Sequence, residues 1–326
     1  MKFYIADAFT DKSFGGNPAG VVILDDGIKV FPEETLMIKV AAELKYSETA
    51  FVMHLPNGDF EIRYFTPVSE VDLCGHATIC SIVCLIEQGL IKASANTSCH
   101  IVTKAGRLSI LVGNGKVMMA MGSVEFGKEL ATFEELREIA DIMGISIDDI
   151  GLKHYDIKNN QLRSFPQMVS TGLFDIILPL NNHQALRSIT PDFSRLSKLS
   201  EKYGVVGVHA FCLNNIFSDS KDSKNNSSNE TLAYCRNFAP LYAIDEEAAT
   251  GTANGALLAY LFERNLIQPN VTYKIEQGES MDRPSEIFGL LTFDIENLTE
   301  KSHKKNPPII KIGGNAKILV KGEIFI

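Results

Sequence analysis

Long apolar runs and positive charge are what this chain has least of. No apolar stretch approaches the roughly 20 residues that a membrane-spanning helix needs. The net charge is −9 across 326 residues, whereas binding to nucleic acid or to an anionic membrane requires a basic face. We therefore expect neither partner. A small anionic ligand stays compatible with this charge, because the N-terminus of a helix attracts anions locally.

The first residues of the sequence lack the apolar core of a signal peptide, since Asp7 interrupts the short run from Met1 to Ala6. This favours a cytoplasmic location, where thiols stay reduced. Apolar residues make up 45% of the chain and charged residues 22%, which is ordinary for a soluble globular protein. The length allows two domains, each with its own core.

The six cysteines include no Cys-x-x-Cys pair. Cys80 and Cys84 are four residues apart on a predicted helix, and Cys74 and His76 lie shortly before them. These thiol and imidazole spacings match no common zinc pattern. We therefore expect small side chains packed in a helix, and no metal.

Two familiar catalytic motifs are missing as well. The sequence has no Gly-x-Ser-x-Gly elbow, so serine-hydrolase chemistry is not supported. Gly113-Asn114-Gly115 could begin a nucleotide-binding loop, but Met118 stands where a third glycine would be, and a strand rather than a helix is predicted to follow. We expect no cofactor.

What the sequence does contain is a repeat. Arg63-Tyr64-Phe65-Thr66-Pro67 is followed by Cys74-Gly75-His76-Ala77, and Arg236-Asn237-Phe238-Ala239-Pro240 is followed by Thr250-Gly251-Thr252-Ala253. Each Arg-x-Phe-x-Pro element precedes a turn of small residues that opens an apolar helix. A duplicated unit predicts two similar lobes with a ligand site where the copies meet. The two arginines are expected to brace this framework rather than to bind substrate.

Hairpins recur in both halves of the chain. Ala50–His54 and Phe60–Phe65 flank the turn signal Asn57-Gly58. His209–Ile216 and Thr231–Phe238 form the second version, around the polar segment Ser218–Asn229. Single helices inserted between hairpins predict an α+β fold of two similar lobes, each a curved and mostly antiparallel sheet around a central helix.

The lobe boundary is expected near residue 120. The N-terminal lobe would span residues 1–120 and the C-terminal lobe residues 121–326. Thr132-Phe133-Glu134-Glu135 predicts a capping box for the helix that follows the boundary. The strands expected in Ile309–Ile326 could stay in the second lobe or return to the first, and the sequence leaves both possibilities open.

The two predicted helix starts are candidate anion-binding sites. Cys74-Gly75-His76 and Thr250-Gly251-Thr252 combine small side chains with the free backbone N–H groups of a first helical turn. Such a glycine can also serve tight helix packing alone. A matched pair in a duplicated chain favours a shared carboxylate-binding role for Cys74, Gly75, Gly251 and Thr252.

Residues that differ between the copies are the candidates for chemistry. Aligning Ala50-Phe51 with Ala210-Phe211 places Glu48 where the second copy has no carboxylate. A carboxylate at the start of a strand is most often solvated, but in a closed cleft burial would raise its pKa to about 6–7 and suit it to proton transfer. His76 and Glu247 also differ between the copies. They could simply favour the helix ends, or orient a polar substituent of the substrate.

Several of these segments together resemble the phenazine-biosynthesis PhzF-like family. The motifs that carry the resemblance are Asn17-Pro18-Ala19, Ser47-Glu48-Thr49-Ala50-Phe51, Asp72-Leu73-Cys74-Gly75-His76-Ala77-Thr78, Arg236-x-Phe238-Ala239-Pro240, Ala249-Thr250-Gly251-Thr252-Ala253, Gln277-Gly278, Met281-x-Arg283-Pro284-Ser285 and Gly313-Gly314. The resemblance implies a diaminopimelate-epimerase-like fold with the active site in the cleft between two lobes. It also implies a cofactor-independent isomerase, similar to trans-2,3-dihydro-3-hydroxyanthranilate isomerase, that is commonly a homodimer.

The resemblance implies roles for individual residues. Glu48 falls on the proton-transferring glutamate of the family and His76 on its active-site histidine. Glu247 falls where the family usually has aspartate, and Thr252 where it usually has serine. Ala248 and Asp282 also depart from the usual proline and glycine, so the natural substrate stays open.

Three functions are compatible with these patterns. The first is an isomerase that shuttles a proton on a small cyclic or unsaturated carboxylic acid. The second is a metabolite-binding or interaction protein on a retired enzyme fold, suggested by the departures around Glu247. The third is an amino-acid epimerase or racemase, which is disfavoured because the related two-cysteine epimerases need a thiol where Thr250 stands.

Overall fold

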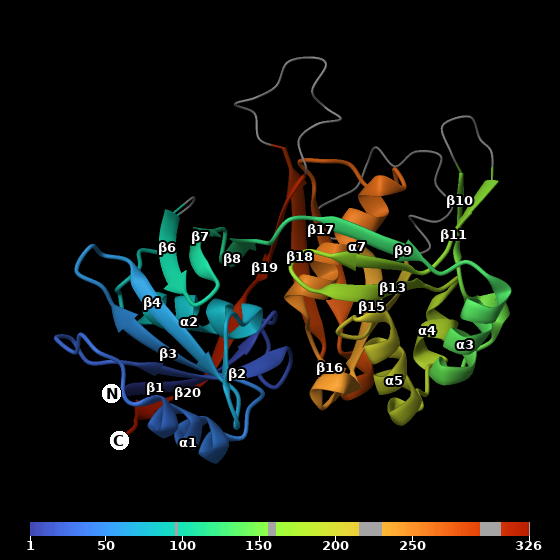
Figure 1. The fold of residues 1–326 in the computed structure, drawn as a ribbon. Coiled ribbons are helices and arrows are strands. Elements are labelled where there is room, and N and C mark those ends of the chain that lie inside the picture. Colours follow the sequence, from blue (N-terminus) through green and yellow to red (C-terminus); the bar gives the residue numbers. More distant parts are fainter. Residues whose placement is uncertain (95–96, 156–160, 215–229, 294–307, 326) are drawn as a thin grey trace. The chain divides into compact units, whose positions relative to one another are not determined.

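The structure is a computed structural model that describes residues 1–94, 97–155, 161–214, 230–293 and 308–325. The polar segment 218–229 lies outside the described residues. The chain divides into two compact units (Figure 1). Unit 1 comprises Met1–Ala120, Arg283–Glu286 and Gly313–Ile326, and unit 2 comprises Met121–Asp282 and Ile287–Ile312. The expected second lobe, residues 121–326, therefore contains two segments that belong to unit 1.

Unit 1 is a mixed sheet with two helices. Its elements are β1 (Lys2–Ala8), β2 (Asn17–Ile23), α1 (Glu34–Leu44), β3 (Thr49–His54), β4 (Phe60–Phe65), β5 (Glu70–Val71), α2 (Gly75–Glu87), β6 (Thr97–Thr103), β7 (Gly106–Gly113), β8 (Lys116–Ala120) and β20 (Ala316–Glu323). β3 and β4 pair antiparallel, as the Asn57-Gly58 turn predicts, and Gly58 adopts the positive φ of +87° that such a turn needs. α1 packs on β3 and β4.

The last strand returns to unit 1, which answers the question that the sequence left open. β20 pairs antiparallel with β1, from Lys2 opposite Glu323 to Ala8 opposite Ala316. β1 pairs on its other side with β2. The strands near both ends of the chain thus lie side by side in one sheet (Figure 1).

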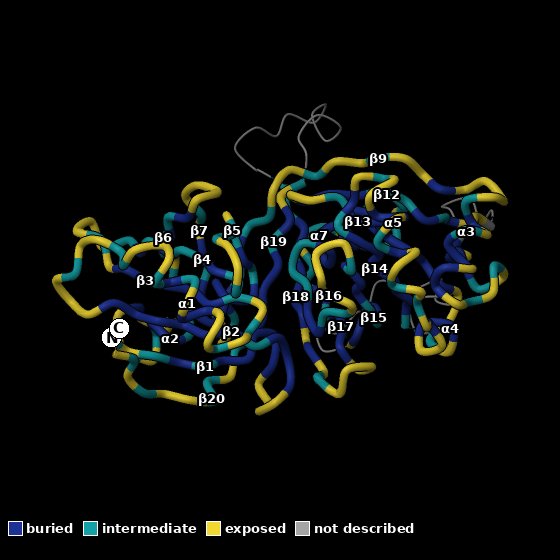
Figure 2. Tube along the Cα trace, turned by 60° about the horizontal axis from the view of Figure 1, so that its bottom comes forward, coloured by how far each residue is buried: buried dark blue, intermediate teal, exposed yellow. Residues whose placement is uncertain are grey.

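Helix α2 is the centre of unit 1. Nine of its 13 residues are buried, because apolar or small side chains cover it on all sides rather than on one stripe. It packs against β1, β2, β3, β8 and β20. β1, β2 and β3 are buried along most of their length, whereas β20 is partly or fully exposed (Figure 2).

Unit 2 places helices on both faces of a sheet. Its elements are β9 (Glu125–Glu129), α3 (Phe133–Met143), η1 (Ile147–Asp149), β10 (Leu152–Tyr155), β11 (Gln161–Ser164), β12 (Gln167–Ser170), β13 (Phe174–Pro179), α4 (His183–Ser188), α5 (Phe193–Tyr203), β14 (Val208–Leu213), β15 (Thr231–Ala239), η2 (Pro240–Tyr242), β16 (Ile244–Glu247), α7 (Gly251–Glu263), β17 (Thr272–Gln277) and η3 (Glu279–Met281). β18 (Ser285–Thr292) and β19 (Ile309–Gly314) have residues in both units. The capping box of α3 is present as predicted, with Thr132 and Glu135 bonding to each other's backbone N–H.

The two faces of the unit 2 sheet have separate cores. Ile176, Leu178 and Val208 belong to a cluster with Leu136 of α3 and Leu196 of α5. Because side chains alternate along a strand, the residues between them face the other side, where α7 packs on β12, β13 and β14. α7 has nine buried residues among its 13, the same number as α2.

The units repeat one order of strands and helices. In unit 1, β2 and β3 are parallel neighbours joined across α1, and β4 and β6 are parallel neighbours joined across α2. In unit 2, β13 and β14 are joined across α4 and α5, and β15 and β17 across α7. A hairpin links each first pair to the second. The fold is therefore α+β and is built from a duplicated pattern.

Candidate active site

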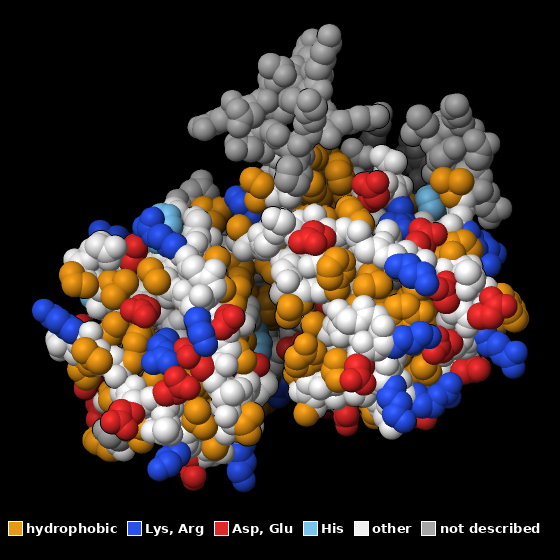
Figure 3. All heavy atoms as spheres, viewed as in Figure 1, with side chains coloured by type: hydrophobic (Ala, Val, Ile, Leu, Met, Phe, Trp, Pro, Cys, Tyr) orange, Lys and Arg blue, Asp and Glu red, His pale blue; other side chains and the backbone are white. Residues whose placement is uncertain are grey.

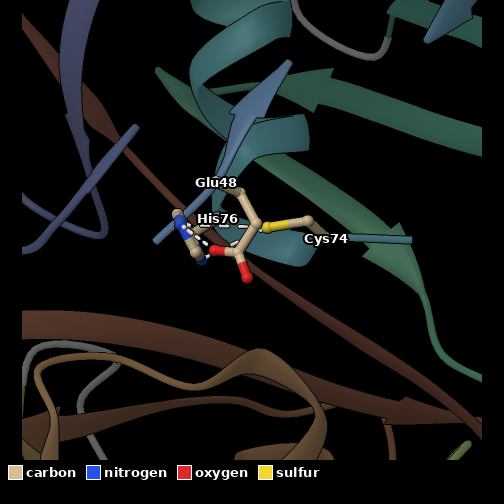
Figure 4. Close-up of side chains that lie close together, drawn as sticks. All are labelled: Glu48, Cys74 and His76. Atoms are coloured by element: carbon tan, nitrogen blue, oxygen red, sulfur yellow. Dashed lines mark hydrogen bonds and ion pairs between the residues drawn. The ribbon is translucent and has the colours of Figure 1, made fainter. Parts of the chain in front are cut away.

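Glu48, Cys74 and His76 come together in unit 1 (Figure 4). Oε2 of Glu48 lies 3.2 Å from Nε2 of His76. Sγ of Cys74 lies 3.4 Å from Nδ1 of His76 and 3.8 Å from Nε2. The side chains of His76 and Glu48 are only 6% and 16% exposed. The carboxylate of Glu48, the imidazole of His76 and the thiol of Cys74 thus form one largely buried cluster.

Local structure explains why these residues meet. Cys74 is the N-cap of α2 and has an extended backbone, so the chain turns sharply into the helix there. His76 lies in the first helical turn. Glu48 immediately precedes β3, and its carbonyl accepts a hydrogen bond from the N–H of Gly20 on the neighbouring strand (3.4 Å). The start of β3 is therefore held beside the N-terminus of α2.

Two further side chains contact the imidazole. Nδ2 of Asn17 lies 3.3 Å from Nδ1 of His76, and Oγ of Ser47 lies 3.4 Å from Nε2. Asn17 begins β2 and belongs to the Asn17-Pro18-Ala19 motif that carries the family resemblance. Its place beside His76 was not foreseen, because a motif in the sequence does not say where the asparagine side chain points.

The ionisation of Glu48 differs from the expectation. Burial by itself would raise the pKa of Glu48, but the hydrogen bond and positive charge of His76, with smaller contributions from Ser47 and Cys74, hold that pKa below its usual value. The expected rise to about 6–7 is therefore wrong for this arrangement. An opposite charge a few ångströms away outweighs the cost of burial. Glu48 is a carboxylate at neutral pH.

The pKa values of His76 and Cys74, the partners of Glu48, are raised rather than lowered. Burial disfavours the charged ring of His76, yet Cys74 and the carboxylate of Glu48 together raise the pKa of His76 well above its ordinary value. Burial and the charge of Glu48 raise the pKa of Cys74 to about 11. At neutral pH, where the thiol of Cys74 is neutral, the carboxylate of Glu48 is the charge that favours the imidazolium form of His76.

Unit 2 holds its candidate residues at the start of α7. Oγ1 of Thr250, the N-cap, donates to Oε2 of Glu247 (2.5 Å). Nε2 of Gln277 donates to the carbonyl of Glu247 (2.7 Å) and to Oγ1 of Thr250 (3.2 Å). Oε1 of Gln277 accepts from Nδ2 of Asn254 (2.8 Å). Glu247 is thus fixed to the first turn of α7 by a buried amide to which the sequence pattern assigned no role in the site.

Gly75, Gly251 and Thr252 lie at equivalent helix starts. Gly75 is the first residue of α2 and Gly251 the first of α7. The caps that precede them have closely similar extended backbones, with φ and ψ of −137° and 116° at Cys74 and −127° and 112° at Thr250. Gly251 and Thr252 are partly exposed. The N–H groups of a first helical turn have no partner within the helix, and such groups attract anions.

The hairpin registers correct the alignment of the two copies. Phe51 pairs with Arg63 in unit 1, whereas Ala210 pairs with Arg236 in unit 2. Aligning the arginines shifts the copies by one residue from the expected match, so the counterpart of Glu48 is Gly207. A backbone hydrogen bond supports the same alignment. The N–H of Ile176 donates to the carbonyl of Gly207 (3.0 Å), just as the N–H of Gly20 donates to the carbonyl of Glu48.

The repeated arginines make matching ion pairs. Arg63 donates from Nε and Nη2 to the two carboxylate oxygens of Glu70 (2.7 and 2.9 Å). Arg236 binds Glu246 in the same two-bond manner (2.9 and 2.8 Å). Each glutamate lies four residues before the cap of the central helix. Both arginines therefore hold the approach to a helix start, which is the bracing role that the sequence predicts.

Asp175 is a second unusual carboxyl group in unit 2. Its residue is 2% exposed, and its Oδ1 has no hydrogen-bond partner among the described residues. Burial, reinforced by the negative charge of Glu247, raises the pKa of Asp175 to about 8, while the backbone N–H of Gly207 acts in the opposite direction. An aspartate after Leu173-Phe174 gave no signal of this in the sequence.

Charged side chains of both signs lie on the surface of the described residues. On the face shown in Figure 3, acidic and basic side chains of the described residues are interspersed over each unit and form no continuous basic patch. None of the helices in the described ranges combines the length and the apolar character that crossing a membrane requires.

The protein has an α+β fold with a buried carboxylate–imidazole pair at a helix start, and comparison with known proteins identifies its family. The model of the family described as phenazine biosynthesis-like protein, PhzC-PhzF, matches residues 6–322. The chain belongs to this family. An uncharacterized isomerase of Clostridium acetobutylicum is 31% identical over 99% of this chain and 97% of its own length.

The fold of this chain is also similar to those of solved structures. The crystal structure of a PhzF-family phenazine biosynthesis protein from Bacillus anthracis has a TM-score of 0.79 and 28% identity, covering 100% of this chain and 99% of the other. A hydroxyproline epimerase from Agrobacterium vitis has a TM-score of 0.57 at 13% identity, covering 99% and 90% of the two chains. The second likeness concerns the fold alone.

Proposed function

We propose that the protein is a cofactor-independent isomerase that moves a proton between two carbons of a small cyclic or unsaturated carboxylic acid. The observation that supports this most directly is the buried Glu48–His76 pair at the start of α2, with its 3.2 Å contact. Family membership supports the reaction class, because the matched relatives include proteins named isomerases. Glu48 is the proton carrier in this proposal.

The reaction begins with Glu48 as a carboxylate. It takes a proton from a carbon next to an unsaturated or carbonyl group, and the electrons of the broken C–H bond move into that group. The double bond shifts as a result. The protonated Glu48 then gives a proton to another carbon of the substrate, so one proton leaves the substrate and one returns. The carboxyl proton of Glu48 exchanges with solvent in a fraction of turnovers, so the substrate gains deuterium in deuterated water. A positioned base of this kind contributes typically about 10²–10⁴-fold in rate.

His76 tunes and positions the base. Its imidazolium keeps Glu48 ionised in spite of burial, which supplies the base form at neutral pH. The same interaction makes the carboxylate less basic, so the substrate must bring a carbon acid that is activated by its own unsaturation. His76 and Glu247 also orient a hydroxyl or amino substituent of the substrate.

The carboxylate of the substrate binds the helix starts. Gly75 in unit 1, and Gly251 and Thr252 in unit 2, offer backbone N–H groups, which are stabilising partners for an anion. Glu247, tied to Thr250 and Gln277, forms the polar edge of the binding site.

The same residues disfavour a two-thiol racemase. That mechanism needs one thiol on each face of the carbon, and the counterpart of Cys74 at the start of α7 is Thr250. The Thr250 hydroxyl is already bonded to Glu247. The thiol of Cys74, with a pKa of about 11, is also a poor source of thiolate at neutral pH.

Deuterium exchange tests the proposal. The protein is incubated in deuterated water with a panel of small unsaturated carboxylic acids, beginning with trans-2,3-dihydro-3-hydroxyanthranilate, and the mass of each acid is followed. We expect one acid to gain deuterium and to isomerise. Glu48→Gln should lower this rate by at least about 100-fold, while the matched control Glu43→Gln, an exposed glutamate on α1, should not.

Two results would contradict the proposal. Exchange at the wild-type rate in Glu48→Gln would remove Glu48 from the proton transfer. Tight binding of a carboxylic acid without exchange, across the whole panel, would favour the metabolite-binding alternative on a retired enzyme fold.

A further inference from the structure

The Glu48–Cys74–His76 cluster has a property that proton transfer does not require. It offers an oxygen, a sulfur and a nitrogen that all lie within 4.8 Å of one another. Carboxylate, thiolate and imidazole are the three protein ligands that zinc takes most often. The donors come from the start of β3 and from the cap and first turn of α2, so sequence spacing alone could not reveal the set.

Two of the three donor distances are close to those around a tetrahedral zinc ion. Zinc bonds of about 2.0–2.3 Å at tetrahedral angles separate an oxygen from a nitrogen ligand by roughly 3.3 Å, and a sulfur from a nitrogen ligand by roughly 3.6 Å. Here Oε2 of Glu48 and Nε2 of His76 are 3.2 Å apart, and Sγ of Cys74 and Nε2 of His76 are 3.8 Å apart. The Glu48 oxygen and the Cys74 sulfur lie within 4.8 Å of each other, and Sγ is nearer to Nδ1 of His76, at 3.4 Å, than to Nε2. The Cys74 side chain must therefore rotate toward Nε2 to bring the three donors around one ion.

The surroundings also suit a metal. Oε2 of Glu48 is buried, and its close contact is with Nε2 of His76 at 3.2 Å, so an ion bound between the two would share both donor atoms. The other ring nitrogen of His76 lies beside the Asn17 amide at 3.3 Å. Outer contacts of this kind fix the ring of a metal-binding histidine.

We propose that Glu48, Cys74 and His76 form an inhibitory zinc site with three protein ligands and a fourth position open to water or another small ligand. The ion replaces the protons of the thiol and the imidazolium, which leave to solvent as the Zn–S and Zn–N bonds form. It also occupies the carboxylate that carries the proton in catalysis. Zinc binding stands on the geometry alone, whereas its inhibitory effect rests on the proposed function.

This site differs from the metal site that the cysteine spacings could have suggested. That possibility involved Cys80 and Cys84 together with Cys74 and His76. The cluster in the structure omits both of the later cysteines and adds Glu48. The site proposed here is occupied when zinc is available and is not needed for the reaction.

Cobalt and zinc titrations test the site directly. The full chain, reduced and freed of metal with a chelator, is titrated with Zn²⁺ by calorimetry and with Co²⁺ by absorption spectroscopy. We expect one ion per chain, with tetrahedral Co²⁺ bands and a thiolate-to-cobalt charge-transfer band. Cys74→Ala should abolish that band and weaken zinc binding by at least about tenfold. Cys84→Ala, a buried cysteine on the same helix, should change neither.

A second variant separates ligand loss from misfolding. Glu48→Gln should weaken zinc binding while the charge-transfer band stays, because the thiolate ligand is still present. Zinc binding that Cys74→Ala leaves unchanged, or a cobalt complex without the charge-transfer band, would overturn the site. With an exchanging substrate in hand, zinc should stop deuterium incorporation at the concentration at which it binds, and a chelator should restore it. Full exchange with zinc bound would overturn the inhibition.

The two proposals can fail separately. If no acid in the panel exchanges deuterium, the proposed function fails, and the cobalt spectrum still decides whether the zinc site exists. If exchange depends on Glu48 but cobalt gives no thiolate band, the zinc site fails and the isomerase proposal stands.

Discussion

Glu48 and Gly207 occupy equivalent positions in the two units, yet only the first carries a side chain. Each carbonyl accepts a hydrogen bond from the parallel neighbouring strand, from Gly20 in unit 1 and from Ile176 in unit 2. A Cβ atom at Gly207 would lie 1.8 Å from the carbonyl oxygen of Phe238. Unit 2 therefore has no room for a side chain at this position, so the carboxylate of Glu48 has no counterpart in the second copy.

Gly207→Ala should be strongly destabilising. The added methyl group would meet backbone atoms, which cannot rotate away, so we expect a loss of at least about 2–3 kcal/mol in the free energy of unfolding. Urea denaturation measures it. Gly322→Ala is the control, because a Cβ at Gly322 would have open space around it, and its effect should stay within about 0.5 kcal/mol. Equal stability of the two variants would contradict the predicted collision.

Arg236→Met should lower the free energy of unfolding, because it removes one of the two bracing ion pairs. Arg236 and Glu246 are 12% and 15% exposed, and Nη1 of Arg236 also donates to the carbonyls of Leu186 and Ile189. Removing the guanidinium leaves a mostly buried carboxylate without its counter-charge, which costs roughly 3–5 kcal/mol.

The control for this variant is an exposed ion pair. Lys321 and Glu87 are about half exposed, so Lys321→Met should leave the free energy of unfolding close to that of the wild type, because solvent screens such a pair. Urea midpoints of both variants give the comparison. A loss at Arg236 no greater than at Lys321 would show that the ion pair does not brace the strand before α7.

Local signals predicted much of the fold. The Asn57-Gly58 turn and the Thr132 capping box mark a hairpin and a helix start correctly, because each depends on a few neighbouring residues. The repeat of Arg63 and Arg236 also pointed to matching frameworks, and both arginines make the same kind of ion pair.

Features that depend on distant contacts could not be predicted in this way. The one-residue shift between the copies is set by strand pairing, and it moved the counterpart of Glu48 to Gly207. The low pKa of Glu48 depends on His76, which reaches it only when α2 packs beside β3. The pairing of β20 with β1 joins strands near opposite ends of the chain, and no local pattern decides it.

Asp175 should make the protein less stable as the pH rises. Its pKa is raised from 3.8 to about 8 in the fold, first by burial and then by the negative charge of Glu247. Between these two values the folded state holds a proton that the unfolded state has lost. Stability from this group is therefore complete below about pH 4 and is lost progressively up to about pH 8.

Asp175→Asn tests this dependence. The variant has no proton to lose, so its stability relative to the wild type should grow between about pH 4 and about pH 8, reaching on the order of 2–5 kcal/mol. Urea denaturation at several pH values measures the difference. Asp141→Asn, an exposed aspartate on α3, should show no such trend. A constant difference between Asp175→Asn and the wild type across this range would contradict the raised pKa.

Gln277→Met should weaken substrate binding more than it slows the chemical step. Gln277 is 2% exposed, and its amide joins the Glu247 carbonyl, the Thr250 hydroxyl and Asn254. Methionine keeps the length of the side chain but removes these bonds, so Glu247 and the start of α7 lose their support. We expect KM for the exchanging acid to rise about tenfold with a smaller fall in kcat, and a stability loss of about 1–3 kcal/mol.

Gln268→Met is the matched control for Gln277. Gln268 is exposed, so the same change of side chain should leave both kinetic constants and the unfolding midpoint close to those of the wild type. Steady-state kinetics of the two variants with one acid gives the comparison. A fall in kcat at unchanged KM in Gln277→Met would place the amide in the proton-transfer step instead, because only interactions made in the transition state lower kcat and kcat/KM together.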